Sequence, residues 1–95
     1  MNNPELFETD DLLTESGWRW LMEDSGHIWF HIDGAYYFLF PEGIHRYGLC
    51  YYSDKDTGNF PRWTFTSESE FLNSKLFNGK SVLERLGDFK SYEPE

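Results

Sequence analysis

Three histidines and a single cysteine are the side chains that could bind a metal ion or act as a nucleophile. His27 and His31 would share one face of a strand, but their Cα atoms would lie about 13 Å apart at the usual rise per residue. One zinc ion could not bind both unless other strands supplied further ligands. His45 is expected on the opposite face, and Cys50 lies within a predicted strand with no orienting group nearby in the sequence. We therefore predict no metal site and no catalytic cysteine.

The acidic residues suggest two further kinds of chemistry, calcium binding and acid–base catalysis. Asp54 and Asp56 resemble the opening of a calcium-binding loop, but the twelfth position of that loop, which should be acidic, is Phe65. The acidic pairs at 10–11 and 23–24 could transfer protons only within a desolvated cleft, for which a small sheet under short helices leaves little room. The chain has no Gly-x-Ser-x-Gly motif and no glycine-rich phosphate loop. The sequence thus predicts a protein that is not an enzyme and holds no cofactor.

The charge of the chain is acidic and unevenly distributed. Seventeen acidic residues against eight basic ones give a formal net charge of −9, and residues 1–33 hold eight of the acids but only one base, Arg19. Such a field repels nucleic acid and anionic membranes and speeds the encounter with basic proteins. We expect a basic protein partner and no direct binding to nucleic acid, although the acidity could also serve only to keep an aromatic-rich protein soluble.

The length of 95 residues fits one domain, residues 1–95. Folding at this size hides only about 60–65% of the surface of the open chain, so a few large side chains must supply the stability. Aromatic residues, 20% of the chain, can do so. One cysteine permits no internal disulfide, the opening residues lack the pattern of a secretory signal, and no apolar stretch approaches the roughly 20 residues that span a bilayer. These features predict a cytoplasmic protein that does not enter a membrane.

Residues 18–66 alternate aromatic or β-branched runs with turn signals, as consecutive antiparallel strands do. We predict strands at about 18–23, 27–32, 35–40, 44–53 and 61–66, joined as a five-stranded antiparallel meander. The strongest local signal is Asp33-Gly34, because both residues accept the positive φ angles of a two-residue hairpin turn.

Two short helices are predicted after the strands. Ser67 to Glu70 forms a capping box at the start of a helix over 68–77, and a second box at 81–84 opens a short helix that extends toward residue 89. Residues 3–7 could begin a further short helix with Asn3 as its cap, and residues 91–95 are expected to form a loose tail. The predicted fold is therefore α+β, with both C-terminal helices packed on one face of the sheet.

Side chains alternate in direction along a strand, so the predicted register divides the sheet into two faces. The first face is apolar and is expected beneath the C-terminal helices. Its members are Trp18, Trp20, Met22, Ile28, Phe30, Ile32, Ala35, Tyr37, Leu39, Tyr47, Leu49 and Tyr51, with Trp63 and Phe65 beside them. The second face mixes aromatic with charged side chains, a composition that suits neither a core nor an ordinary solvent-exposed surface. It holds Arg19, Leu21, Glu23, His27, Trp29, His31, Tyr36, Phe38, Phe40, Ile44, Arg46, Cys50 and Tyr52.

The second face is the predicted binding site for a protein partner. An apolar centre inside a charged border is the usual anatomy of an interface, and Tyr, Trp and Arg are enriched among binding hot spots. The candidate partner-binding residues are Glu15, Arg19, Glu23, Asp24, Trp29, Tyr36, Arg46, Tyr52, Asp54 and Asp56. The N-terminal segment could instead cover this face, or two copies of the chain could pair through it, so the protein is expected to be a monomer or a weak homodimer.

A resemblance to a known family lies in residues 63–84. The run WTFTSESEFL at 63–72, followed by KLFNGKSVLE at 75–84, resembles the closing portion of some small bacterial immunity proteins of contact-dependent inhibition and related polymorphic toxin systems. In those proteins a strand leads into an acidic-capped helix and then through a turn into a last helix. The resemblance implies a cytoplasmic inhibitor that binds and occludes a cognate toxin domain, often a nuclease, without catalytic residues.

A nuclease must present a basic cleft to its substrate, and an acidic protein can be drawn to that cleft and block it. Two other functions stay open at this point. One is a homodimeric or adaptor module that uses the same face for protein interaction. The other is an anionic mimic of DNA that inhibits a nucleic-acid-binding protein.

Overall fold

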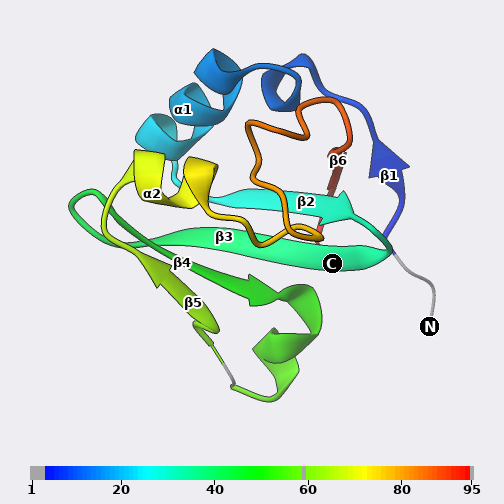
Figure 1. Ribbon diagram of the computed structural model, residues 1–95. Helices are drawn as coiled ribbons and strands as arrows, with labels where there is room; N and C mark the ends of the chain where they lie inside the picture. Colours follow the sequence, from blue (N-terminus) through cyan, green and yellow to red (C-terminus); the bar gives the residue numbers. More distant parts are fainter. Residues whose placement is uncertain (1–3, 59, 95) are drawn as a thin grey trace.

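Six antiparallel strands form one sheet, and two α-helices lie on the same side of it (Figure 1). The computed structural model describes residues 4–58 and 60–94. The strands are β1 (Leu6–Phe7), β2 (Ile28–Ile32), β3 (Ala35–Gly43), β4 (Arg46–Tyr51), β5 (Trp63–Phe65) and β6 (Lys90–Tyr92), in the spatial order β1-β6-β2-β3-β4-β5. The helices are α1 (Glu15–Asp24) and α2 (Glu68–Asn73), with the 3-10 helices η1 (Asp10–Leu12) and η2 (Tyr52–Asp56). The predicted α+β class is confirmed, whereas the prediction of five strands is one too few.

The central part of the sheet is the predicted meander. β2 and β3 pair in the expected register around a turn in which Asp33 and Gly34 have φ angles of 52° and 79°. The strand predicted at 44–53 is shorter, because β3 continues through an irregular pairing to Gly43 and leaves Ile44 and His45 as the turn. Ile44 therefore lies at a hairpin tip and not on the second face.

The segment predicted as a first strand, 18–23, is instead part of α1. Thr14 caps this helix by accepting a hydrogen bond from the backbone N–H of Gly17 at 3.1 Å. Trp18 and Met22, one helical turn apart, are buried, whereas Trp20 points outward. The alternation of these three residues fits a strand as well as a helix, which is why the strand prediction was wrong. Arg19, Leu21 and Glu23 consequently do not belong to a face of the sheet.

The predicted loose tail is in part a strand. β6 inserts between β1 and β2, with Ser91 opposite Phe30 and Lys90 opposite His31. It thereby covers part of the edge of β2, which a meander alone would leave open. The opening segment forms the two-residue strand β1 and not a helix within its described residues; Asn3, the predicted cap, lies outside them.

The two C-terminal helices were predicted correctly only in part. Ser67 caps α2 by accepting from the backbone N–H of Glu70 at 3.0 Å, but the helix ends at Asn73 and not at 77. The second box also forms, since Ser81 and Glu84 exchange hydrogen bonds of 2.9 and 3.2 Å. No helix follows it in the described chain: residues 82–88 form successive turns and bends that bring Val82 and Phe89 into the core.

The core lies between the sheet and the segments that cover it. We call the covered side the helix-covered face; its buried strand residues are Ile28, Phe30, Ile32, Leu39, Tyr47, Leu49 and Phe65. Trp18 of α1 packs on Phe30 with ring centroids 5.3 Å apart and donates an indole hydrogen bond of 3.1 Å to the carbonyl of Leu12. The strand residues of the predicted first face thus lie in the observed core or pack against it, except Ala35 and Tyr51, which are half-buried outside it.

We predict that Gly17→Ala destabilises the protein, although alanine favours a helix over glycine by about 1 kcal/mol. A Cβ atom at Gly17 would lie 2.2 Å from the backbone carbonyl oxygen of Asp11, where η1 crosses α1. Backbone atoms cannot yield cheaply, so we expect a net loss of about 1–3 kcal/mol in urea unfolding. Ser16→Ala, at the neighbouring exposed position, is the control and should change stability by less than about 0.5 kcal/mol. A Gly17→Ala protein more stable than the parent would contradict the close approach.

Candidate functional site

The predicted partner-binding residues divide between the two sides of the sheet. Glu15, Arg19, Glu23 and Asp24 all lie on α1, which packs over the helix-covered face. Trp29 and Tyr36 lie on the opposite side of the sheet, and Tyr52, Asp54 and Asp56 lie in η2. Arg46 begins β4 and is exposed. The structure therefore assembles two groups of residues, whereas the sequence predicted one.

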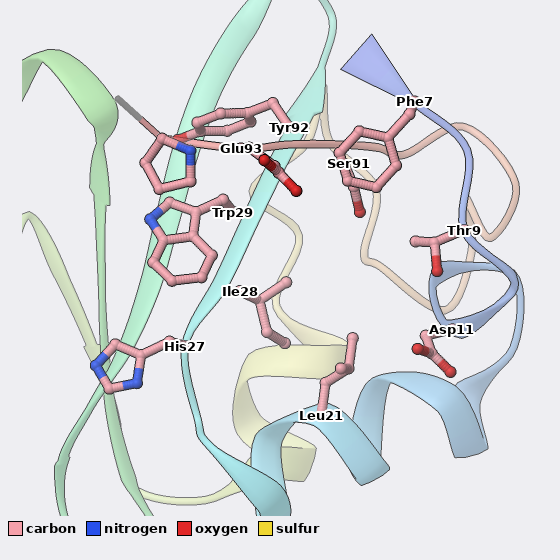
Figure 2. Close-up of a pocket in the computed structure, with 11 residues that line it drawn as sticks. Phe7, Thr9, Asp11, Leu21, His27, Ile28, Trp29, Ser91, Tyr92 and Glu93 are labelled. Carbon is pink, nitrogen blue, oxygen red and sulfur yellow. The ribbon is translucent and has the colours of Figure 1, made fainter. Parts of the chain in front are cut away.

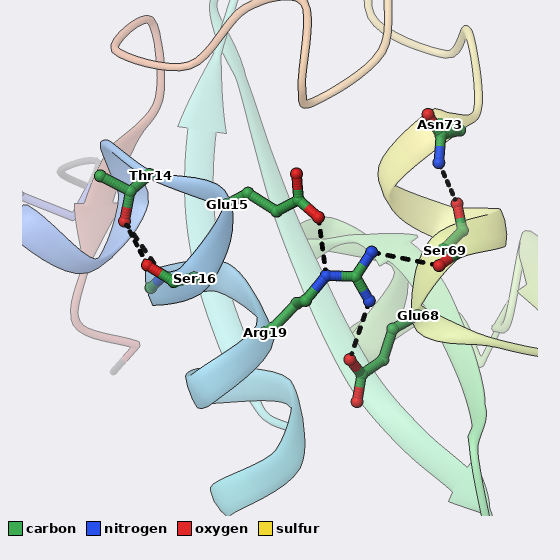
Figure 3. A network of polar contacts seen from close by, with 8 residues as sticks. Thr14, Glu15, Ser16, Arg19, Glu68, Ser69 and Asn73 are labelled. Atoms are coloured by element: carbon green, nitrogen blue, oxygen red, sulfur yellow. Dashed lines mark hydrogen bonds and ion pairs between the residues drawn. The ribbon is translucent and has the colours of Figure 1, made fainter.

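Arg19 joins the two helices (Figure 3). Its guanidinium donates to a carboxylate oxygen of Glu15 at 2.9 Å, to one of Glu68 at 3.3 Å and to the hydroxyl of Ser69 at 3.1 Å. Burial and the neighbouring charge of Glu23 raise the pKa of Glu68 above its ordinary value of 4.5, and the pairing with Arg19 opposes that rise. Arg19 and Glu15 are thus engaged within the molecule, and they fix where α1 lies relative to α2.

The outward side of α1 carries an exposed tryptophan next to acidic residues. Trp20 is 59% exposed, and Glu23 and Asp24 follow it at the spacings that bring helical side chains together. Neither carboxylate forms an ion pair with any described residue. Both sit in the last turn of the helix, where the macrodipole favours cations. We call Trp20, Glu23 and Asp24 the α1 surface.

Sequence reasoning missed Trp20 as a binding residue because a strand would have turned it into the core. One signal could have found it. Thr14 is a strong N-cap residue, and Trp18, Leu21 and Met22 follow at helical spacing, so that a helix starting there leaves Trp20 outside the apolar stripe.

Aromatic rings form a stacked row on the side of the sheet opposite the helices. We call this side the aromatic face; it comprises Trp29, His31, Tyr36, Phe38, Phe40, Cys50 and Tyr92. Trp29 and Phe38 stack at 5.3 Å with an interplanar angle of 8°, and Phe40 follows Phe38 at 5.2 Å. His27 stacks at 6.1 Å beside Trp29, and Phe60 meets Phe40 edge-on at 6.1 Å. The row is half-buried at its centre and exposed at His27 and Phe60.

Glycine permits this row to lie flat on the sheet. Gly48 pairs with Phe40 across β3 and β4, and a Cβ atom at Gly48 would lie 2.8 Å from the ring of Phe40. The ring therefore rests directly on the strand backbone, as aromatic residues do when they cover a glycine in a neighbouring strand.

The chain itself covers part of the aromatic face. Tyr36 donates a hydrogen bond of 3.2 Å to the carbonyl of Pro4, and Tyr92 contacts the rings of Tyr36 and Tyr52 at 5.1 and 5.4 Å. Cys50 is buried there, and burial raises the pKa of its thiol. The predicted second face is thus neither fully open nor sealed by the N-terminal segment.

Asp54, predicted to bind a partner, is held within the molecule. Its carboxylate accepts two hydrogen bonds from Arg62, at 2.7 and 2.9 Å, and one from the backbone N–H of Tyr51 at 2.9 Å. These contacts hold the pKa of Asp54 below its ordinary value of 3.8. Asp54 fixes η2 against the segment before β5, whereas Asp56 on the same turn is exposed.

Two of the cavities lined by described residues border the aromatic face. One, of about 220 Å³, is lined by Trp29, Phe38, Cys50, Tyr51, Tyr52, Lys55, Phe60 and Pro94. The other, of about 430 Å³, lies where β6 ceases to pair with β2, and Figure 2 shows its lining side chains. Leu21 of α1, Phe7 of β1 and Trp29 of β2 reach into it from three elements. The larger cavity is also lined by acidic, hydroxyl and imidazole side chains, those of Asp11, Glu93, Thr9, Ser91 and His27. Among the described residues no hydrogen bond joins any two of these side chains, and the ring of His27 instead contacts the carbonyl of Ser25 at 3.0 Å.

Comparison of the chain with protein families, curated proteins and solved structures finds no match. Among the described residues, no three histidine, cysteine or acidic side chains come close enough together to hold a metal ion. Within the same ranges, no helix is long and apolar enough to cross a membrane.

We predict that Asp54→Asn lowers the stability of the protein near neutral pH. Because the folded-state pKa of Asp54 is lowered, its carboxylate stabilises the fold above the ordinary pKa of 3.8, and that stabilisation is lost as the pH falls through the lower folded value. Urea midpoints of the parent and the variant should therefore differ at pH 7 and converge below about pH 4. Asp56→Asn is the control and should leave the midpoint unchanged at both pH values. A constant difference between parent and Asp54→Asn across this range would show that the charge of Asp54 is not what holds η2.

Proposed function

We propose that this protein is a cytoplasmic inhibitor that binds a cognate toxin domain, a nuclease with a basic active-site cleft, and neutralises it by steric and electrostatic occlusion. In this proposal it belongs with the immunity proteins of contact-dependent inhibition and related toxin systems. The observation that carries the proposal is the α1 surface, on which an exposed tryptophan adjoins two carboxylates that form no ion pair with residues 4–58 or 60–94.

Each feature of the α1 surface is unfavourable for an isolated protein. An exposed indole reduces solubility, and acidic residues in the last helical turn oppose the macrodipole by about 0.3–1 kcal/mol each. Places where local rules are broken are expected to be functional sites. A basic partner would reverse both costs, because its cations would pair with Glu23 and Asp24 while Trp20 enters an apolar pocket or stacks on an arginine.

The net charge supports the same kind of partner. A formal charge of −9 on 95 residues steers the molecule toward a basic cleft and away from nucleic acid. Steering acts mainly on the association rate, whereas a buried aromatic anchor acts mainly on dissociation. The two components of the α1 surface can therefore be separated by kinetics.

The order of elements at residues 63–73 is in keeping with the immunity-protein resemblance. Strand β5 leads directly into α2, which Ser67 and the acidic residues of its first turn cap. The last helix that the resemblance implies is replaced by the turns over 82–88. This agreement in element order supports the proposal less directly than the α1 surface does.

The experiment that tests the function compares the parent protein with a variant in which only the α1 surface is changed. The parent protein and a Trp20→Ala/Glu23→Lys/Asp24→Lys variant are used as matched baits in extracts of the native host, and proteins retained by the parent alone are identified by mass spectrometry. We expect a basic domain whose nuclease activity falls to zero at one equivalent of the parent protein. Identical retained proteins for both baits, or a retained domain whose activity is unaffected, would contradict the proposal. A self-associated protein in sedimentation, with no retained partner, would favour the homodimeric alternative.

We predict that Glu23→Lys and Asp24→Lys slow association with the retained domain by about tenfold at low salt and much less at high salt, because screening removes the steering. Asp56→Lys makes the same charge change on η2, away from α1, and is the control; its effect should be several-fold smaller. Stopped-flow mixing at two salt concentrations measures these rates. An association rate that does not respond to salt would rule out electrostatic steering.

We predict that Trp20→Ala speeds dissociation by about 30-fold or more, the usual result of truncating a hot-spot tryptophan. Its unfolding free energy should change by less than about 0.5 kcal/mol, because the side chain is largely exposed. A variant that dissociates at the parental rate would show that the indole lies outside the interface.

A further inference from the structure

The ladder between β6 and β2 ends earlier than its register allows. Ser91 pairs with Phe30, so the next pair in the same ladder would place Tyr92 opposite Trp29. The ladder with β2 stops before that pair, while Tyr92 still pairs with Leu6 of β1. Pro94, two residues later, has no N–H to donate to a strand. The ladder therefore does not extend along the first residues of β2, and the cavity of about 430 Å³ opens there.

Pro94 lines both cavities that border the aromatic face. Trp29 is the only other described residue that the two linings share. The tail formed by Glu93 and Pro94 thus lies by Trp29, between the 220 Å³ cavity and the 430 Å³ cavity. Figure 2 shows Trp29 together with Tyr92 and Glu93 at the wall of the larger cavity. The two cavities therefore meet at Trp29 and Pro94, the residues that line both of them, and we call the two together the groove.

The chemistry of the groove suits a proline-containing segment. The smaller cavity is walled mainly by the rings of Trp29, Phe38, Tyr52 and Phe60. Aromatic-lined grooves bind prolyl rings in the polyproline II conformation, which needs no hydrogen-bonded ladder and loses little entropy on binding. The molecule already places one prolyl ring of its own, Pro94, at this wall.

We propose that the aromatic face is a binding groove for an extended, proline-containing segment of a protein partner, and that Glu93 and Pro94 occupy part of this groove in the unbound protein. The smaller cavity lies on the side of the sheet opposite the α1 surface, and the larger one lies at the edge of β2 without contact to Trp20, Glu23 or Asp24. The proposal therefore does not depend on toxin inhibition. A tethered segment acts at an effective concentration in the millimolar range, and it therefore weakens the apparent affinity of any competitor.

The probe is an octaproline peptide with blocked termini, and a glycine–serine peptide of the same length is the control. Binding is followed by the indole N–H resonances of ¹⁵N-labelled protein, with those of Trp29 and Trp20 assigned through Trp29→Leu and Trp20→Ala. The full chain is compared with a chain ending at Tyr92. We expect octaproline to shift the Trp29 resonance and leave that of Trp20 unmoved, with a Kd about tenfold lower for the shortened chain. Trp29→Leu in the shortened chain should abolish binding, and the control peptide should not bind.

Pro94→Ala in the full chain removes the prolyl ring but keeps the backbone of residues 93 and 94, so it provides a test even if the shortened chain does not fold. Its Kd for octaproline should lie between those of the full and shortened chains, because only the prolyl ring is removed. Equal Kd values for the full chain, Pro94→Ala and the shortened chain would overturn the competition. Absence of octaproline binding by folded Pro94→Ala and shortened proteins, or a shift at Trp20 in place of Trp29, would overturn the groove itself.

Discussion

The structure depends on the burial of one phenylalanine in the middle of the sheet. Phe30 of β2 contacts the rings of Trp18, Phe71, Phe77 and Phe89, which come from α1, α2 and the turns that follow it, at centroid distances of 5.3 to 6.5 Å. Neither α-helix is long enough to be stable alone in water. The covering segments are therefore stabilised by the burial of their aromatic rings against Phe30. A chain of 95 residues has a small core, so it needs such large side chains to fold.

Because the covering segments all gather on one side, the two remaining aromatic surfaces differ in chemistry. On the outer side of α1, exposed Trp20 lies beside the carboxylates of Glu23 and Asp24, the combination from which we propose a basic partner. On the aromatic face, Trp29 and Phe38 stack in a row of rings with few charges, the feature from which we propose an extended, proline-containing ligand. The sequence pattern placed acidic residues and aromatic rings on one surface, whereas in the structure the acidic α1 surface and the aromatic face lie on opposite sides of the sheet.

The sequence predicted the parts of the fold that local chemistry determines. Asp33 and Gly34 specify the turn between β2 and β3, and Ser67 specifies the start of α2. It misassigned α1 because Trp18, Trp20 and Met22 alternate as in a strand, and the helical signal of Thr14 was missed; contact with η1 and burial in the core stabilise the helix. It missed β6 because three residues carry almost no pattern, and their pairing is decided by the uncovered edge of β2. The candidate site changed for the same reason. Because residues 15–24 form α1, four predicted binding residues, Glu15, Arg19, Glu23 and Asp24, lie on the helix-covered side of the sheet and not with the aromatic face.

The antiparallel pairing of β1 with β6 determines how the molecule responds to mechanical force. Leu6 lies opposite Tyr92 and Phe7 opposite Ser91, so the chain enters and leaves this ladder at the same end. Tension applied through the two ends of the described chain would load the bonds between these strands one after another, as in a zipper, and not all together. Pulling on the two ends would therefore separate β1 from β6 before it strains the aromatic interior.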